Sequence, residues 1–197
     1  MRCTRRSSRY APSARVSAVV RPENTSNMSE NDVRNHYLRQ LEDHFIIETE
    51  IPGKHFSGKT LKIDAVVRPR DTNSWKNPAV ALGIEFKDSN RYSENYDTKD
   101  FTKWLAQCVD YSNTNWVDYG YIYIFTCPSL IEGVAPGVIG EPMFVENFMG
   151  QIGIGELKNI SNYGVSFVLH GHHRIWSVNA GVEFGKHYSL KRKFGSR

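Results

Sequence analysis

The chain has few cysteines and no long apolar run, and both shortages narrow the class of protein. Cys3, Cys108 and Cys127 lie far apart among the 197 residues and form no Cys-x-x-Cys pair. Such an odd, sparse set argues against a disulfide scaffold and a cysteine-ligated zinc site, and favours a reducing compartment such as the cytoplasm. No apolar run approaches the roughly 18–20 residues that a membrane helix requires, so we expect no membrane partner.

A basic excess is also absent from most of the chain. The formal net charge is +4, but residues 1–27 contain six arginines and one glutamate, which leaves 19 basic and 20 acidic residues elsewhere. Any nucleic-acid site in residues 28–197 must therefore be a local patch. Those 170 or so residues are long enough for a single domain with its own core.

Residues 1–27 are predicted to be a disordered basic N-terminal extension, because they are rich in arginine and serine and lack hydrophobic periodicity. Three interpretations stay open for this segment. It resembles an organelle transit peptide in composition, it has the charge of a basic nucleic-acid-binding arm, and it fits an upstream extension before a start at Met28.

From Met28 onward, hydrophobic spacing predicts a helix, three strands, a second helix and a fourth strand. Ser29 can cap the first helix, in which apolar residues recur every three or four positions. Turn residues separate the strands. The expected strands lie at 45–51, 59–69, 79–87 and 119–126, and the second helix at 99–114. This order predicts an α/β fold with a mixed central sheet flanked by helices, followed by a β-rich C-terminal extension.

Charged residues interrupt two of the most apolar predicted strands. Glu85 and Lys87 are two residues apart and share a strand face, and Asp64 lies in the neighbouring strand. Charges in such strands cost several kcal/mol unless they are paired or bind a metal. Two adjacent carboxylates favour Mg²⁺, and a nearby lysine can hold a phosphate. The three residues therefore favour metal-assisted phosphodiester hydrolysis, and a structural ion-pair network is the alternative.

The pattern "KID", then "EFK" about twenty residues later, resembles the core of the PD-(D/E)XK nuclease superfamily. "KID" replaces the proline-aspartate pair of the family pattern. The resemblance covers about residues 29–126 and implies a restriction-endonuclease-like fold with an αβββαβ core. It also implies that Asp64, Glu85 and the carbonyl of Phe86 bind Mg²⁺ or Mn²⁺, and that Lys87 is catalytic.

Two outer helical elements add to the resemblance. Many family members carry a metal-binding glutamate on the first helix, and Glu30 is the expected residue, with Glu42 as the alternative. Some also carry a Gln-x-x-x-Tyr motif on the helix after the Glu-x-Lys strand. Gln107 and Tyr111 match that motif, and Lys103 shares their helical face. The resemblance implies that these three residues bind the substrate.

The sequence therefore predicts a magnesium-dependent nuclease that hydrolyses nucleic acid, with DNA as the expected substrate. One alternative is a catalytically inactive nucleic-acid-binding or assembly protein of the same fold, and another is a small-molecule- or protein-binding α/β module. Trp75, in a polar loop, is expected to be exposed for base stacking. A second Glu-x-Lys, Glu156 to Lys158, comes late and lacks a preceding aspartate strand, so no role is expected for it.

Overall fold

The computed structural model describes residues 28–87, 98–127, 149–169 and 173–190. The predicted disordered extension over 1–27 lies outside these ranges. The named elements, in chain order, are α1 (Glu30–Leu41), β1 (Phe45–His55), β2 (Thr60–Pro69), β3 (Leu82–Phe86), α2 (Thr98–Ser112), β4 (Thr114–Trp116), β5 (Tyr123–Cys127), β6 (Ile154–Ile160), β7 (Gly164–Leu169), β8 (His173–Ser177), β9 (Gly181–Val182) and a 3₁₀ turn at Phe184–Lys186. No helix in the described ranges is long and apolar enough to cross a membrane.

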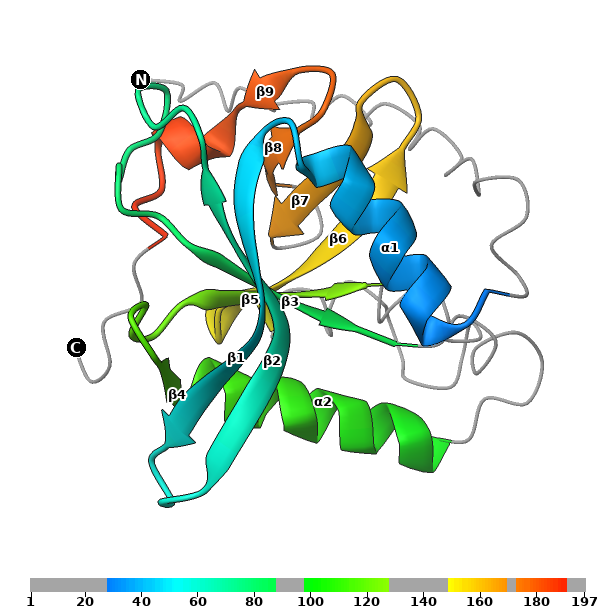
Figure 1. Cartoon of the computed structure of the whole chain (residues 1–197), viewed down its shortest axis with the longest axis vertical. Coiled ribbons are helices and arrows are strands. Elements are labelled where there is room, and N and C mark those ends of the chain that lie inside the picture. The colour runs from blue at the N-terminus through cyan, green and yellow to red at the C-terminus, as the bar shows by residue number, and fades with distance from the viewer. Residues whose placement is uncertain (1–27, 88–97, 128–148, 170–172, 191–197) are drawn as a thin grey trace, which may run out of the picture.

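A single curled sheet dominates the described part of the chain (Figure 1). Its nine strands follow the order β4-β1-β2-β3-β5-β6-β7-β8-β9. The central strands β3, β5 and β6 are parallel, and the pairs on both sides of them are antiparallel. The long connections that parallel pairing requires are therefore confined to the middle of the sheet.

The expected α/β architecture, a mixed sheet flanked by helices with an αβββαβ core, is wrong. The described residues are mostly β, with 44% strand against 23% helix, and the sheet forms a curled half-barrel. The strands expected to form a separate C-terminal extension instead continue the same sheet, because β6 pairs in parallel with β5. Helices therefore cover much less of the sheet than a helix-flanked fold requires.

Helix α1 begins as the sequence predicts. The Ser29 hydroxyl accepts a hydrogen bond from the Asp32 amide at 3.3 Å, and the Asp32 carboxylate accepts one from the Ser29 amide, which completes a capping box. The buried face of the helix carries Val33, Tyr37 and Leu41. These side chains pack into the larger hydrophobic core, together with residues of β2, β3, β5 and β7.

Aromatic side chains hold one end of this core together. Phe45 makes edge-to-face contacts with Phe167 and Trp176, with ring centroids 5.7 and 4.7 Å apart. Phe45 also contacts Trp75 at 6.4 Å. Trp75 is only 7% exposed, so the prediction of an exposed stacking residue is wrong. Trp75 has polar neighbours in the sequence, but its side chain packs against Phe45 on the distant strand β1.

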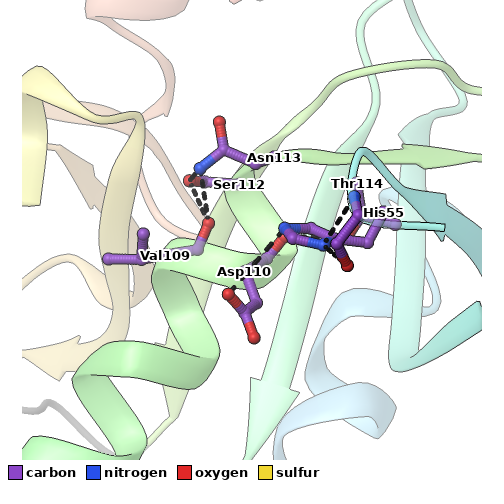
Figure 2. A network of polar contacts seen from close by, with 7 residues as sticks. His55, Val109, Asp110, Ser112, Asn113 and Thr114 are labelled. Carbon is purple, nitrogen blue, oxygen red and sulfur yellow. Dashed lines mark hydrogen bonds and ion pairs between the residues drawn. The ribbon is translucent and has the colours of Figure 1, made fainter. Parts of the chain in front are cut away.

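The C-terminal end of α2 is fixed by a polar network (Figure 2). Thr114 donates its hydroxyl proton to the Asp110 carbonyl at 2.8 Å. On β1, His55 pairs in register with Thr114, and its Nε2 lies 3.8 Å from Asp110 Oδ1. Strand β1 thus extends through Pro52 to His55, where the sequence predicted a turn, because β4 pairs with this end. The network anchors α2 against the β1–β2 hairpin.

Candidate active site

Asp64 lies where the backbone pairing of β2 ends on the β3 side and is interrupted at one position on the β1 side. The ladder between β2 and β3 ends at Ala65 and Ile84, one step before Asp64 and Glu85 would pair. On the other side Asp64 lies opposite Glu50, which has no paired partner in the ladder and a left-handed backbone with φ 59°. A non-glycine residue in that conformation is strained, and such strain gathers at functional sites.

Beyond the end of the ladder, the Asp64 side chain accepts a hydrogen bond from β3 in place of the β2 backbone. Its Oδ2 accepts a hydrogen bond from the Phe86 amide at 2.7 Å. In an extended strand the N–H and C=O of one residue point to the same edge, so the Phe86 carbonyl also faces the β2 side. The end of β3 therefore presents a carbonyl next to the aspartate.

Glu85 is the most buried charged residue of the cluster, at 2% exposure. Its Oε1 accepts hydrogen bonds from Lys87 Nζ and from Gln107 Nε2, the latter at 2.6 Å. Its Oε2 is also buried and has no hydrogen-bond partner among the described residues. A buried carboxylate oxygen without a partner is costly, so Glu85 requires either a proton or a cation at that oxygen.

Gln107 and Tyr111 connect helix α2 to the two strands. Gln107 Nε2 donates to the Tyr111 hydroxyl at 2.8 Å as well as to Glu85, and the Tyr111 hydroxyl donates to the Lys62 carbonyl at 2.8 Å. The i,i+4 spacing places both side chains on one face of the helix, as the sequence predicted. This chain of hydrogen bonds fixes Glu85 relative to the strand that carries Asp64.

Burial dominates the electrostatics of the cluster. It raises the pKa of Glu85 from 4.5 to about 8, against the lowering effect of Lys87 and with a further increase from the charge of Asp64. The Asp64 and Glu85 carboxyl groups therefore act on each other directly. Burial, with the Glu85 charge as the next cause, also raises the pKa of the Cys108 thiol and of the Tyr111 phenol. Near neutral pH, the raised pKa thus favours the protonated form of Glu85 when no cation is bound.

The donor set fits a small hard cation with few protein ligands. Within the described ranges no group of three or more histidine, cysteine, aspartate or glutamate side chains gathers at one place. Mg²⁺ does not need such a cage, because it binds through one or two carboxylates and keeps several waters or substrate phosphate oxygens. Asp64, the unpartnered Oε2 of Glu85 and the Phe86 carbonyl supply that number.

The structure brings five of the predicted side chains together: Asp64, Glu85, Lys87, Gln107 and Tyr111. Within the described ranges, neither first-helix candidate makes a hydrogen bond or ion pair with this cluster. Glu30 is exposed at the start of α1, and Glu42 is exposed at its C-cap. Lys103 is exposed on α2, four residues before Gln107. The Glu30, Glu42 and Lys103 assignments stay predictions.

The sequence analysis missed two participants in this site, the Lys62 carbonyl and the irregular backbone at Glu50. A main-chain acceptor leaves no signal in a sequence. Glu50 carried none either, because only glycine would have marked a left-handed position.

Comparison of the chain with models of protein families, with curated proteins and with solved structures finds no match.

Proposed function

We propose that this chain is a metal-dependent nuclease that hydrolyses phosphodiester bonds in nucleic acid, with DNA as the expected substrate. The observation that supports it best is the state of Glu85. The carboxylate is buried beside Asp64, one oxygen is held by Lys87 and Gln107, and the other has no partner among the described residues. Perturbed, buried carboxylates paired in this way are typical of functional sites.

Asp64 and Glu85, with the Phe86 carbonyl, would hold Mg²⁺ or Mn²⁺. A bound divalent ion supplies positive charge that polarises the phosphate and lowers the pKa of the attacking water. Because the pKa of Glu85 is raised to about 8, cation binding near neutral pH displaces a proton from this carboxyl group.

Lys87 is the catalytic cation of this proposal. Its ammonium group contacts Glu85, and the Lys87 side chain is 20% exposed, so the lysine is partly accessible to a substrate phosphate. There it neutralises charge that develops on the phosphate in the transition state. Gln107 and Tyr111 act as positioning residues, since their side chains hydrogen-bond to Glu85 and to the Lys62 carbonyl.

The test is hydrolysis of end-labelled linear DNA, closed circular DNA and single-stranded RNA by the purified full chain with Mn²⁺. We expect cleavage by the wild type and a loss of about 10²-fold or more in Asp64→Asn and Lys87→Ala. Lys54→Ala is the matched control, because Lys54 is an exposed lysine on β1. Cleavage that persists undiminished in both site variants would remove the proposal.

A nucleic-acid-binding protein without hydrolytic activity is the second candidate. It is favoured by the contact between Lys87 and Glu85, which already satisfies the ammonium group within the fold. That function predicts salt-sensitive binding of DNA or RNA without cleavage under any divalent cation, and the same assay distinguishes the two.

A further inference from the structure

A second carboxylate–ammonium pair lies in the sheet, two strands away from Glu85 and Lys87. Glu156 and Lys158 are two residues apart on β6, so their side chains share a face, and Lys158 Nζ lies 2.6 Å from Glu156 Oε2. Glu156 is 4% exposed. No role was expected for this pair from the sequence, because a sequence shows where the pair lies in the chain but not where it lies in the sheet.

Strand register places the two pairs on the same face. Glu85 on β3 pairs with Thr126 on β5, and Thr126 pairs with Glu156 on β6. Because all three strands are parallel and in step, the three side chains project to one side of the sheet. Thr126 is fully buried, so a row of three polar residues crosses the interior. Such a row costs desolvation free energy that apolar residues would avoid, which favours a functional reason for it.

The spacing decides what the second pair can do. Glu85 and Glu156 lie two strand spacings apart, roughly 10 Å between backbones, with Thr126 between them. Each carboxylate already contacts the lysine of its own strand. Sharing one cation is therefore disfavoured, because cation ligands must lie within about 2.6 Å of the ion. Glu156 and Lys158 therefore do not belong to the cation site at Glu85.

The two lysines lie near the carboxyl ends of two parallel strands, since Lys87 directly follows β3 and Lys158 lies two residues before the end of β6. The side chains of Lys87 and Lys158 are 20% and 15% exposed, so both have partial access to solvent. Because the backbones of β3 and β6 lie roughly 10 Å apart, two lysines on these strands match a polymer of phosphates better than a single phosphate.

We propose that Lys158, oriented by Glu156, binds a backbone phosphate next to the one that is cleaved, and that the substrate is therefore a polynucleotide. This inference rests on the proposed function. Lys158 is a substrate-binding residue and Glu156 is a positioning residue. The competing explanation is a structural ion pair, which apolar residues of similar volume can often replace without loss of stability.

The test compares the wild type with the double variant Glu156→Gln/Lys158→Met, which removes both charges of the pair together. Lys158→Arg retains the charge, and Lys59→Met removes one lysine charge, as the Lys158→Met half of the double variant does, in the exposed turn between β1 and β2. The first readout is fluorescence anisotropy of a labelled oligonucleotide with Ca²⁺ at several salt concentrations. The second is hydrolysis with Mn²⁺ of bis(4-nitrophenyl) phosphate, which contains one phosphodiester.

We expect the double variant to bind the oligonucleotide about tenfold more weakly, the loss typical of one charged hydrogen bond. Its salt slope should fall by about 0.7 to 0.9, the value for one phosphate contact. Hydrolysis of the small ester should not change, Lys158→Arg should restore binding, and Lys59→Met should resemble the wild type.

A folded double variant that binds like Lys59→Met would overturn the inference. If the double variant does not fold, Lys158→Gln decides by the same criterion. A wild type that binds the oligonucleotide but hydrolyses neither substrate would refute the nuclease proposal, while the anisotropy measurements would still decide the role of Lys158.

Discussion

Replacement of Glu85 by glutamine gives the sharpest test of the electrostatics at the site. Glutamine keeps the shape of the side chain and a carbonyl oxygen for Lys87 and Gln107, but it cannot titrate. The pKa of Glu85 is raised from 4.5 to about 8 in the folded protein, mainly by burial. At 1.36 kcal/mol per pKa unit, that rise corresponds to about 5 kcal/mol of folding free energy.

The sign follows from proton binding. Between pH 4.5 and about 8 the folded protein holds a proton at Glu85 that the unfolded chain has released. The contribution of this carboxyl group to the free energy of unfolding is therefore fully present below pH 4.5 and is lost as the pH rises to 8. Above pH 8 Glu85 is ionised in both the folded and the unfolded protein, so the free energy of unfolding no longer changes with pH on its account. Glu85→Gln removes this dependence, so the variant should gain stability over the wild type across that interval.

The assay is equilibrium urea unfolding of both proteins with EDTA, at pH values from 4 to 9. We expect the free energy of unfolding of Glu85→Gln, minus that of the wild type, to increase by about 5 kcal/mol over this range. Taking the difference cancels the titration of all other groups. Parallel pH profiles for the two proteins would show that Glu85 ionises normally and would refute the burial argument.

Two additions make the measurement specific. Glu48→Gln is the matched control, because the pKa of this half-exposed glutamate is lowered from 4.5, first by a hydrogen bond from Tyr119, so its difference profile should be flat above pH 4.5 and slope the other way only below it. Mn²⁺ should stabilise the wild type increasingly as the pH approaches 8, since cation and proton compete for Glu85. Stabilisation of Glu85→Gln by Mn²⁺ to the same degree would exclude Glu85 as a ligand.

Two further predictions concern packing around the site. The Cys108 thiol is fully buried, and burial raises its pKa. Iodoacetamide should therefore not alkylate this residue in the native protein until the protein unfolds, as followed by peptide mass spectrometry. Rapid alkylation of the native protein would contradict the packing of α2. Gly155→Ala should lower the free energy of unfolding by about 2 kcal/mol or more, as measured by urea unfolding. The added Cβ would collide with the Val168 carbonyl oxygen and lie 2.6 Å from Phe125 Cε1. An unchanged stability would mean that β6 does not approach β5 so closely.

Local features of the chain were predictable from sequence. The capping box at Ser29, strand β2 and helix α2 follow from residue types and spacing within a few turns of chain. The cluster of Asp64, Glu85 and Lys87 was also predictable, since the cost of isolated charges in apolar strands requires them to meet.

The overall architecture was not predictable in the same way. Strand β6, "IGELKNI", mixes apolar and polar residues and gives a weak pattern by itself. It is buried because it pairs with β5, and pairing between distant segments leaves no local trace. The same limit hid the row through Thr126 and the burial of Trp75, whose contacts come from other strands.

The left-handed backbone at Glu50 has a consequence for attempts to increase the heat tolerance of this protein. A non-glycine residue at φ 59° costs roughly 1–2 kcal/mol, which Glu50→Gly would relieve. The same change would remove the ion pairs of Glu50 with Lys62 at 2.9 Å and Arg34 at 3.6 Å and add the chain entropy of glycine. Heat tolerance at this position, directly opposite Asp64, therefore depends on the balance between backbone strain and two ion pairs.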